Sequence, residues 1–501
     1  MQKKLYKKHP DYDYYTSKIQ LDKSFDSLRN AIKQPMTSKE FYFLISPLIA
    51  QVHQAHMSTT PAFKKNNKER RKYLNKMGPS PLLNFDYIWI DNKLLVEKNN
   101  ASDTMVKIGD QLISINGIEV QKIYDKYIST ISSDGYNQTG LDFFFARKIP
   151  MFYRNELKDV DIANYTFKNE KGLYEKVFVR KLKNEKVKPK VDTLKNIEPS
   201  HPIKNKDSLA RINNLKEKEL EEAEKKEERM KTVYGYDKKD KEYIRSLKFL
   251  DPDSNIAYFK IKSFSGGIYK KAYGEIFDSI ENVGSNTLVL DLRDNVGGRA
   301  AEVGNLFGYF VDTNYKMFLP SKVSSKTSLL SPGMYKNTPK LLWPILSLYY
   351  PTYVFSRYFW TSKLEDGFYY YNGLKGIKFS YPQTPIFAGK IYLLVNGGTF
   401  SAASIIASRM STLSNVTVLG EETGGDYNGT VAGVLPIYTL PNSKIKWRVG
   451  LMHIKPYNQR PLKGRGVMPE KYFKTSITDL KLKRDVILDW LKQLGSNSLE
   501  F

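Results

Sequence analysis

The residue with the clearest chemical potential is a serine at the junction between an apolar segment and a helical pattern. Ser401 lies in NGGTFSAAS, after the apolar run KIYLLV and before an amphipathic run. A serine at a strand-to-helix turn exposes its hydroxyl near free backbone amides that can hold an oxyanion. Serine is also a favoured helix N-cap residue. This segment alone leaves both interpretations open, a nucleophile and a cap.

A second glycine-rich turn occurs in DLRDNVGGRAAE, residues 291–302. The pair Gly297 and Gly298 would let another backbone approach closely, and the amides of such a turn can point at a ligand. A turn without any ligand has the same composition. The motif therefore gains meaning only in combination with the first.

The composition indicates a folded protein of two or three domains. The 501 residues are 41% hydrophobic and 13% aromatic, with no cysteine. The absence of cysteine excludes disulfides, thiolate zinc sites and a cysteine nucleophile. The net charge of +26 could attract nucleic acid or anionic lipid. The lysines are spread along the chain without a recognisable nucleic-acid module, which favours a solvated basic surface and no specific nucleic-acid partner.

No secretory signal is visible, because the basic start MQKKLYKKHPDYDYYTSK is not followed by an apolar run. No segment is long and clean enough to predict a transmembrane helix. The nearest, LLWPILSLYYPTYVF (341–355), is interrupted by Pro344 and Pro351. We expect a buried or groove-lining insertion there, within an aromatic region that extends to 381. A membrane-contacting hairpin is the alternative.

Hydrophobic periodicity divides the chain into four parts. Residues 1–83 have helical spacing, and a helix that begins at a cap, Thr37 or Ser38, ends near His56. Residues 84–182 read as short strands, and VKIGDQLISINGIEV resembles the signature of a PDZ domain, which binds a peptide as an added strand. Residues 183–245 are a charged linker or insertion that includes a helix with almost no apolar face.

The remaining part, residues 246–501, has the pattern of an α/β domain. IAYFKIKSF, TLVLDLRDN, KIYLLVNG and NVTVLGEE are continuous apolar runs, as expected for buried parallel strands. Helical segments separate them, and SAASIIASRMSTL completes a strand-helix-strand unit. An amphipathic helix closes the chain. The predicted fold class is therefore α/β.

Four ordered motifs resemble one peptidase family. LVLDLRDNVGG, YLLVNGGTFSAAS, VLGEETGG and GRGVMPE are similar in order and spacing to the tail-specific, or C-terminal-processing, serine peptidases. HPDYDYYTSK and AHMST resemble the Bacteroidetes envelope members. The resemblance implies a crotonase-like core with an N-terminal helical segment and a PDZ-like domain, and peptide-bond hydrolysis through an acyl-enzyme on Ser401. The implied oxyanion amides are those of Ala402 and of Gly297, in preference to Gly298. No metal or organic cofactor is implied.

The general base has to come from elsewhere in the chain. Asp426 stands where many members of the family carry a lysine, so a Ser-Lys dyad cannot form there. His56 matches the histidine of the tricorn-like branch, which uses a Ser-His pair. A histidine can accept the serine proton and return it to the leaving amine. His453, in GLMHIKP, is the reserve candidate.

The sequence departs from the family pattern at several positions. Ala55 and Val296 replace family glycines, and Lys463 occupies the position of the tricorn-like glutamate. The acid that would orient the histidine is therefore open. The alternatives are Glu421 and Glu422, which could equally be structural.

Three functions remain. The first is a serine peptidase, an endopeptidase or tail-trimming enzyme that cuts protein or peptide substrates in the cell envelope, in the periplasm or outside the cell. The location comes from the resemblance. The second is a degenerate peptidase fold that binds peptides or apolar ligands without cutting them. The third, nucleic-acid binding, rests on charge alone. The sequence does not determine the natural substrate or the oligomeric state.

Overall fold

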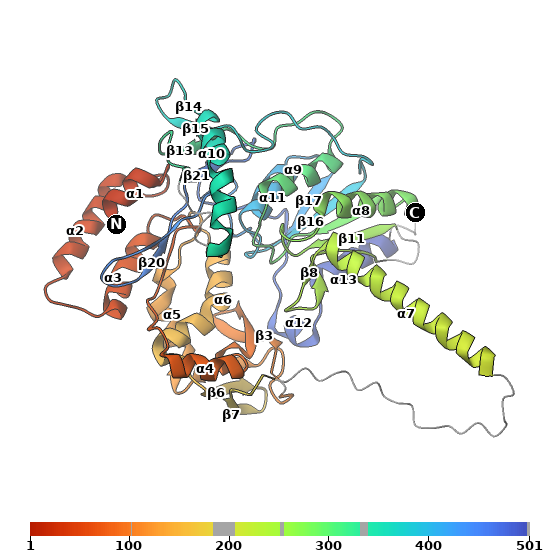
Figure 1. Ribbon diagram of the computed structural model, residues 1–501, viewed down its shortest axis with the longest axis horizontal. Helices are drawn as coiled ribbons and strands as arrows, with labels where there is room; N and C mark the ends of the chain where they lie inside the picture. Colours follow the sequence, from red (N-terminus) through yellow and green to blue (C-terminus); the bar gives the residue numbers. More distant parts are fainter. Residues whose placement is uncertain (102, 184–205, 251–254, 331–338, 498–501) are drawn as a thin grey trace.

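The computed structural model describes residues 1–101, 103–183, 206–250, 255–330 and 339–497. These residues form a mixed α/β protein. The N-terminal helices lie at one end of the molecule, the largest α/β layer at the other, and a β-rich module below and between them (Figure 1). The expected α/β class is confirmed.

The core of the C-terminal part is a six-stranded sheet of order β10-β11-β12-β16-β17-β22. Pairing is parallel from β11 to β22, and β10 is an antiparallel edge strand. The strands are β10 (Arg245–Phe249), β11 (Ile256–Ile261), β12 (Thr287–Asp291), β16 (Lys390–Val395), β17 (Val416–Gly420) and β22 (Lys471–Tyr472). The four apolar runs predicted as core strands are β11, β12, β16 and β17, so this prediction is confirmed.

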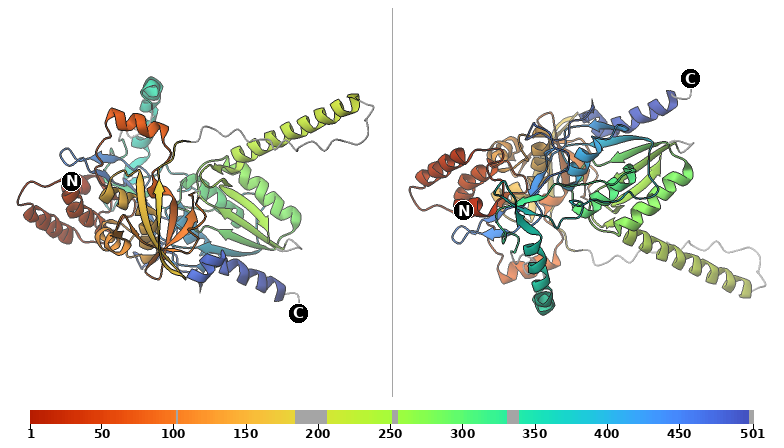
Figure 2. Two further views of the ribbon diagram at one scale, coloured as in Figure 1. Left: turned by 90° about the horizontal axis from the view of Figure 1, so that it is seen from below. Right: turned by 90° about the horizontal axis from the view of Figure 1, so that it is seen from above.

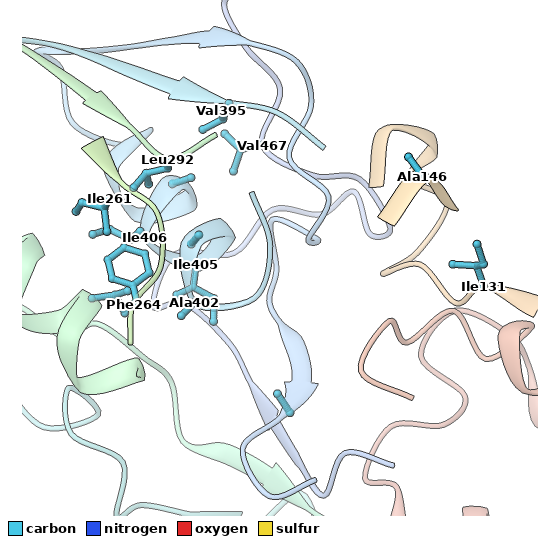
Figure 3. Packing of buried hydrophobic residues seen from close by; sticks show 14 of the residues in the cluster. Ile131, Ala146, Ile261, Phe264, Leu292, Val395, Ala402, Ile405, Ile406 and Val467 are labelled. Carbon is cyan, nitrogen blue, oxygen red and sulfur yellow. The ribbon is translucent and has the colours of Figure 1, made fainter. Parts of the chain in front are cut away.

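Helices cover both faces of this sheet, which explains why its strands are apolar on both sides. One face carries α8 (Tyr269–Val283), α9 (Ala300–Phe307) and α11 (Ala402–Met410); α13 (Val486–Asn497) packs on the other face through Ile487 and Leu491. Figure 3 shows Ala402, Ile405 and Ile406 of α11 packed near Ile261, Phe264 and Leu292. This packing fixes the start of α11 against the carboxyl ends of the strands.

Two smaller sheets lie beside this core, and one of them joins the N-terminal part to the C-terminal part through β1. One has the order β1-β20-β19 and the other β14-β15-β13-β21-β18. Their strands are β1 (Ser58–Thr60), β13 (Ser321–Val323), β14 (Thr361–Lys363), β15 (Tyr369–Tyr371), β18 (Thr430–Ala432), β19 (Ile437–Thr439), β20 (Lys446–Arg448) and β21 (Met452–Ile454). Because β1 pairs with β20, with Ser58 opposite Arg448, the segment that follows His56 is part of the C-terminal scaffold.

The N-terminal helices are α1 (Gln2–Lys8), α2 (Lys18–Ala31) and α3 (Ser38–Ala50). Thr37 caps α3, and its hydroxyl and amide are paired with Glu40 in a capping box. The predicted start of this helix is confirmed, but the helix ends at Ala50 and not near His56, because the chain turns at His53, whose φ is 53°. Helix α3 buries Tyr42, Ile45, Leu48 and Ile49, whereas Leu44 is exposed.

The β-rich module has a sheet of order β2-β3-β4-β6-β7, and β5 pairs with β4. Its elements are β2 (Phe85–Ile90), β3 (Lys93–Asn99), β4 (Gln111–Ile115), β5 (Ile118–Glu119), α5 (Val120–Tyr127), α6 (Gln138–Leu157), β6 (Ile162–Asn169) and β7 (Gly172–Val179), with α4 (Lys68–Lys76) preceding them. Helix α6 packs on β2 and delivers side chains toward the C-terminal domain.

The predicted linker falls partly on residues 184–205, which lie outside the described residues. Its charged helix is α7 (Lys206–Tyr234), followed by β8 (Tyr236–Asp237) and β9 (Glu242–Tyr243). Figures 1 and 2 show α7 extending away from the body of the molecule. An arm surrounded by water needs no apolar face, which agrees with its composition.

The expectation of a buried insertion at 341–355 is wrong. These residues belong largely to α10 (Trp343–Phe359), which stands out from the body (Figure 2) and has no buried residue. Helix α10 touches the body through Tyr350 and Tyr353, whose hydroxyls donate to the carbonyls of Leu330 and Leu329. The helix is apolar nearly all round, so hydropathy predicted burial that the tertiary structure does not provide. Over the described ranges, no helix is both long and apolar enough to cross a membrane.

Candidate active site

Ser401 lies at the sharp turn between β16 and α11, and its geometry is that of a projecting hydroxyl. It occupies the N-cap position, but its side chain makes no capping hydrogen bond. Its backbone has φ 58° and ψ −121°, whereas a capping serine has an extended backbone. Such a conformation is strained for a residue with a side chain, and strain of this kind is concentrated at functional sites. The interpretation of Ser401 as a helix cap is therefore wrong, because its side chain does not cap the helix.

The two glycine-rich turns contact each other directly. The Phe400 amide donates to the Asn295 carbonyl at 3.0 Å. A Cβ on Gly297 would lie 2.8 Å from both the Cβ of Ser401 and the amide nitrogen of Ala402, so only glycine fits there. The exit of this turn is held by Arg299, which pairs with buried Glu302. The predicted combination of the two motifs thus exists in three dimensions.

The amides near Ser401 differ in their availability. The Gly297 amide donates to Oδ1 of Asn295 at 2.9 Å, so it is already used. The carbonyl of Gly297 and the amide of Arg299 both bond to Phe264, which directs the Gly298 amide away from that strand. The Ala402 amide is the first in α11 and has no partner within the helix. Among the described residues the Gly298 and Ala402 amides are therefore the pair without a hydrogen-bond partner, and the expected preference for Gly297 is not supported by its hydrogen bonds.

Val296 stands in this turn where the family has a glycine. Its side chain is 48% exposed and therefore points to solvent.

His56 lies beside this turn although it is far away in sequence. Its ring stacks on the ring of Phe400, the residue before Ser401, with centroids 4.7 Å apart. Nε of Arg448 donates to the His56 carbonyl at 2.9 Å and fixes the backbone. Burial, with a smaller contribution from the charge of Arg448, lowers the pKa of His56 to about 3. The ring is therefore neutral at pH 7, which is the state that a general base needs.

On the Nδ1 side of the His56 ring lie Thr430 and a buried acid, Asp134, which the sequence did not indicate. Nδ1 of His56 lies 3.0 Å from Oγ1 of Thr430. The Thr430 hydroxyl lies beside the fully buried Asp134, whose Oδ1 accepts the Ala55 amide at 2.8 Å. Oδ2 of Asp134 has no hydrogen-bond partner among the described residues. Burial raises the pKa of Asp134 to about 7.

The acids chosen from the sequence lie elsewhere. Glu422 accepts two hydrogen bonds from Arg465, at 2.9 and 2.7 Å, and one from the Gly466 amide. Glu421 lines a separate cavity of about 310 Å³ together with Asp142 and Asp294, and burial raises its pKa. Within the described part of the chain neither glutamate contacts His56. Neither is placed to orient His56 in this geometry.

The remaining polar candidates are also accounted for. Asp426, at the family lysine position, accepts hydrogen bonds from the Tyr15 hydroxyl and from the Gly464 amide, at 2.6 Å each. His453 is buried, and its Nδ1 lies 2.5 Å from Oδ2 of Asp11, which also pairs with Lys322. These contacts hold the N-terminal segment on the C-terminal domain. Where the chain is described, no group of three acidic or histidine side chains could hold a metal ion.

Comparison with known proteins identifies the class to which the site belongs. Residues 255–472 match the model of peptidase family S41. The chain therefore contains a domain of this serine peptidase family, and the resemblance seen in its motifs is confirmed. No curated protein sequence matches the chain.

Solved structures share the fold. Mature CPAF is 12% identical, with a TM-score of 0.58 over 99% of this chain and 95% of that chain. A serine-to-alanine mutant of CPAF is also 12% identical, with a TM-score of 0.61 over 98% and 95% of the two chains. The photosystem II D1 C-terminal processing protease is 11% identical, with a TM-score of 0.41 over 96% and 94%. The likeness to CPAF extends over nearly the whole chain, so the fold outside residues 255–472 is shared as well.

Proposed function

We propose that the protein is a serine peptidase that hydrolyses peptide bonds through an acyl-enzyme on Ser401, with His56 as the general base. The observation that carries this proposal is the strained, uncapped Ser401 at the start of α11, together with the neutral ring of His56 stacked on Phe400, the residue before it. A hydroxyl that served only as a cap would not need this backbone conformation. The serine peptidase family of residues 255–472 supports the same conclusion.

In the proposed reaction, Nε2 of His56 takes the proton of the Ser401 hydroxyl as its oxygen attacks the substrate carbonyl. The amides of Gly298 and Ala402 stabilise the oxyanion that forms. His56 then gives this proton to the leaving amine as the peptide C–N bond breaks. A water molecule attacks the acyl carbonyl while His56 takes a proton from it, and His56 returns that proton to the Ser401 oxygen as the ester bond breaks. This chemistry requires no metal or organic cofactor.

Thr430 and Asp134 are proposed as positioning residues for His56. With a proton on Nδ1, the N–H group of His56 would donate to the Thr430 hydroxyl, and this hydroxyl would donate to the Asp134 carboxylate. This arrangement leaves the lone pair on Nε2 and stabilises the imidazolium that forms when the serine proton moves. In the tricorn-like pattern a glutamate at the position of Lys463 would orient the histidine. Because this chain has a lysine there, the Thr430–Asp134 pair would take over that role.

We expect kcat/KM to rise as the pH increases through about 7, because burial raises the pKa of Asp134 to about 7 and the carboxylate forms only above it. His56 itself, with a pKa lowered to about 3, ionises only at much lower pH. Asp134→Asn should remove the rise of kcat/KM near pH 7 and lower the value of kcat/KM reached at higher pH by about 10- to 100-fold. A pH profile of kcat/KM for the two proteins measures both effects.

Thr430→Ser, which keeps the hydroxyl, should retain the parent profile, whereas Thr430→Val should resemble Asp134→Asn. A rise of kcat/KM near pH 7 that persists unchanged in Asp134→Asn would show that another group titrates there. Thermal unfolding of each variant separates a loss of structure from a loss of positioning.

We further propose that the β-rich module, residues 84–182, binds an extended segment of the substrate as a PDZ-like domain, and that the protein works in the cell envelope. The turn residues of VKIGDQLISINGIEV and the edge strands of the five-strand order β2-β3-β4-β6-β7 support strand addition. The location is supported by the resemblance to envelope members of the family. The proposal covers both cleavage inside a protein chain and trimming of its C-terminal tail.

Labelling with a fluorophosphonate probe tests the proposed function. The purified protein should become labelled, and peptide mapping should find the adduct on Ser401, because only a serine activated by a base reacts readily. Ser401→Ala should not label. An unlabelled parent that still binds peptides would favour the alternative, a noncatalytic binding protein on a peptidase fold.

A further inference from the structure

A cavity of about 300 Å³ adjoins the proposed catalytic residues. Two of its lining residues are direct neighbours of that site, since Ala55 precedes His56 and Phe400 precedes Ser401. The ring of Phe144 meets the ring of Phe400 edge-on, with centroids 5.3 Å apart, and forms an apolar wall. A peptide group held for attack by Ser401 would therefore lie next to the mouth of this cavity.

The cavity is lined by three cations and by no acidic side chain. Lys446 and Arg448 come from β20 and point to the same face because they are two residues apart in a strand. Lys148 comes from α6 and lines the same cavity. Among the described residues, none of the three forms an ion pair; Arg448 donates only to the His56 carbonyl. Three hydroxyl residues, Ser58, Thr60 and Ser132, complete the polar part of the lining.

Leaving these cations without a counter-charge is costly. Burial, and next the charge of Arg448, lowers the pKa of Lys148 to about 8, and burial also lowers the pKa of Arg448. Like charges brought together in a partly buried site repel each other, and desolvated cations are normally paired. An anionic group in the cavity would relieve both penalties.

We propose that this cavity is a subsite that binds a carboxylate of the peptide substrate close to the bond that is cut. The carboxylate is either an acidic side chain or a free C-terminus. The proposal rests on the proposed function, because the cavity matters for catalysis only if Ser401 attacks the bound peptide. It adds a specificity that the family domain alone does not define.

Binding to the Ser401→Ala variant tests the subsite without requiring hydrolysis. The probes are capped, otherwise neutral nonapeptides in which one Glu is moved through each position, each compared with Gln at the same position. A second pair carries no acidic side chain and has either a free or an amidated C-terminus. Fluorescence anisotropy at pH 7 should show about tenfold or tighter binding of one carboxylate series, as expected for a charge-assisted hydrogen bond.

Lys148→Gln in the same background should abolish most of this preference, and Lys148→Arg should restore it because the positive charge returns. Arg154→Gln is the matched control: it removes a cation from the same helix, and Arg154 stacks on Phe63, away from the cavity. This control should keep the full preference for the carboxylate peptide.

The outcomes separate the two proposals. If Glu and Gln peptides bind equally well, and the free C-terminus has no advantage, the subsite is overturned even when the parent enzyme cuts them. If the parent cuts no peptide but the carboxylate preference persists and depends on Lys148, the subsite stands and the peptidase function fails. Preference for the Glu series alone identifies a side-chain pocket; preference for the free C-terminus alone identifies a tail-binding pocket.

Discussion

Ser401→Ala is expected to lower kcat for peptide hydrolysis by about 10⁶-fold, because loss of the nucleophile removes the whole acyl-enzyme route. The change removes only the Oγ atom, which makes no capping hydrogen bond to α11. We therefore expect little loss of thermal stability. Steady-state kinetics with a peptide that the parent cuts, together with thermal unfolding, measure both quantities.

Ser404→Ala is a suitable control for this variant. Ser404 lies one turn further along α11, is buried, and donates its hydroxyl to the Ser401 carbonyl at 2.8 Å. Its loss should change kcat by less than about tenfold, the effect of one modest hydrogen bond. A Ser401→Ala variant that kept more than about one hundredth of the parent rate would be far more active than an enzyme without a nucleophile. Another residue would then have to be the nucleophile.

His56→Ala is expected to lower kcat by about 10⁴- to 10⁶-fold, because the Ser401 hydroxyl loses its proton acceptor. The double variant Ser401→Ala, His56→Ala should be no slower than the worse single variant, since residues that act as one unit are not additive. Kinetics of the three variants over the same substrate range make this comparison.

His453→Gln provides the control, because His453 is buried like His56 but lies on β21 and is paired with Asp11. The amide of glutamine can retain a hydrogen bond to Asp11, so activity should stay within about tenfold once folding is verified. A large loss of activity in His453→Gln together with an active His56→Ala would transfer the role of base to the reserve histidine.

Local sequence was sufficient for the elements of the C-terminal domain. The apolar runs that became β11, β12, β16 and β17 are buried on both faces, so their hydrophobicity is continuous and easy to detect. The start of α3 was equally clear, because Thr37 and Glu40 lie three residues apart and satisfy each other's hydrogen bonds. Such signals depend only on residues close in the chain.

Local sequence was misleading about which apolar segments are buried, because burial depends on the surrounding fold as well as on hydropathy. Helix α10 has the composition of a buried segment, yet its attachment to the edge of the fold leaves Leu348 82% exposed. Periodicity predicts that an apolar face exists; whether another element covers it depends on the rest of the fold.

By itself, the sequence determined the α/β core, the two glycine-rich turns, Ser401 as a candidate and His56 as its partner by resemblance. Only the tertiary structure decided that Ser401 is an uncapped, strained residue, that the Gly297 amide already donates to Asn295, and that Thr430 and Asp134 lie behind His56. The physical reason is distance along the chain. The contacts that settle these points join β1 to β20, α6 to the turn before α11, and β18 to the segment that precedes β1. No residue in those pairs carries a local signal of its partner, so the cationic cavity that they enclose is a property of the fold alone.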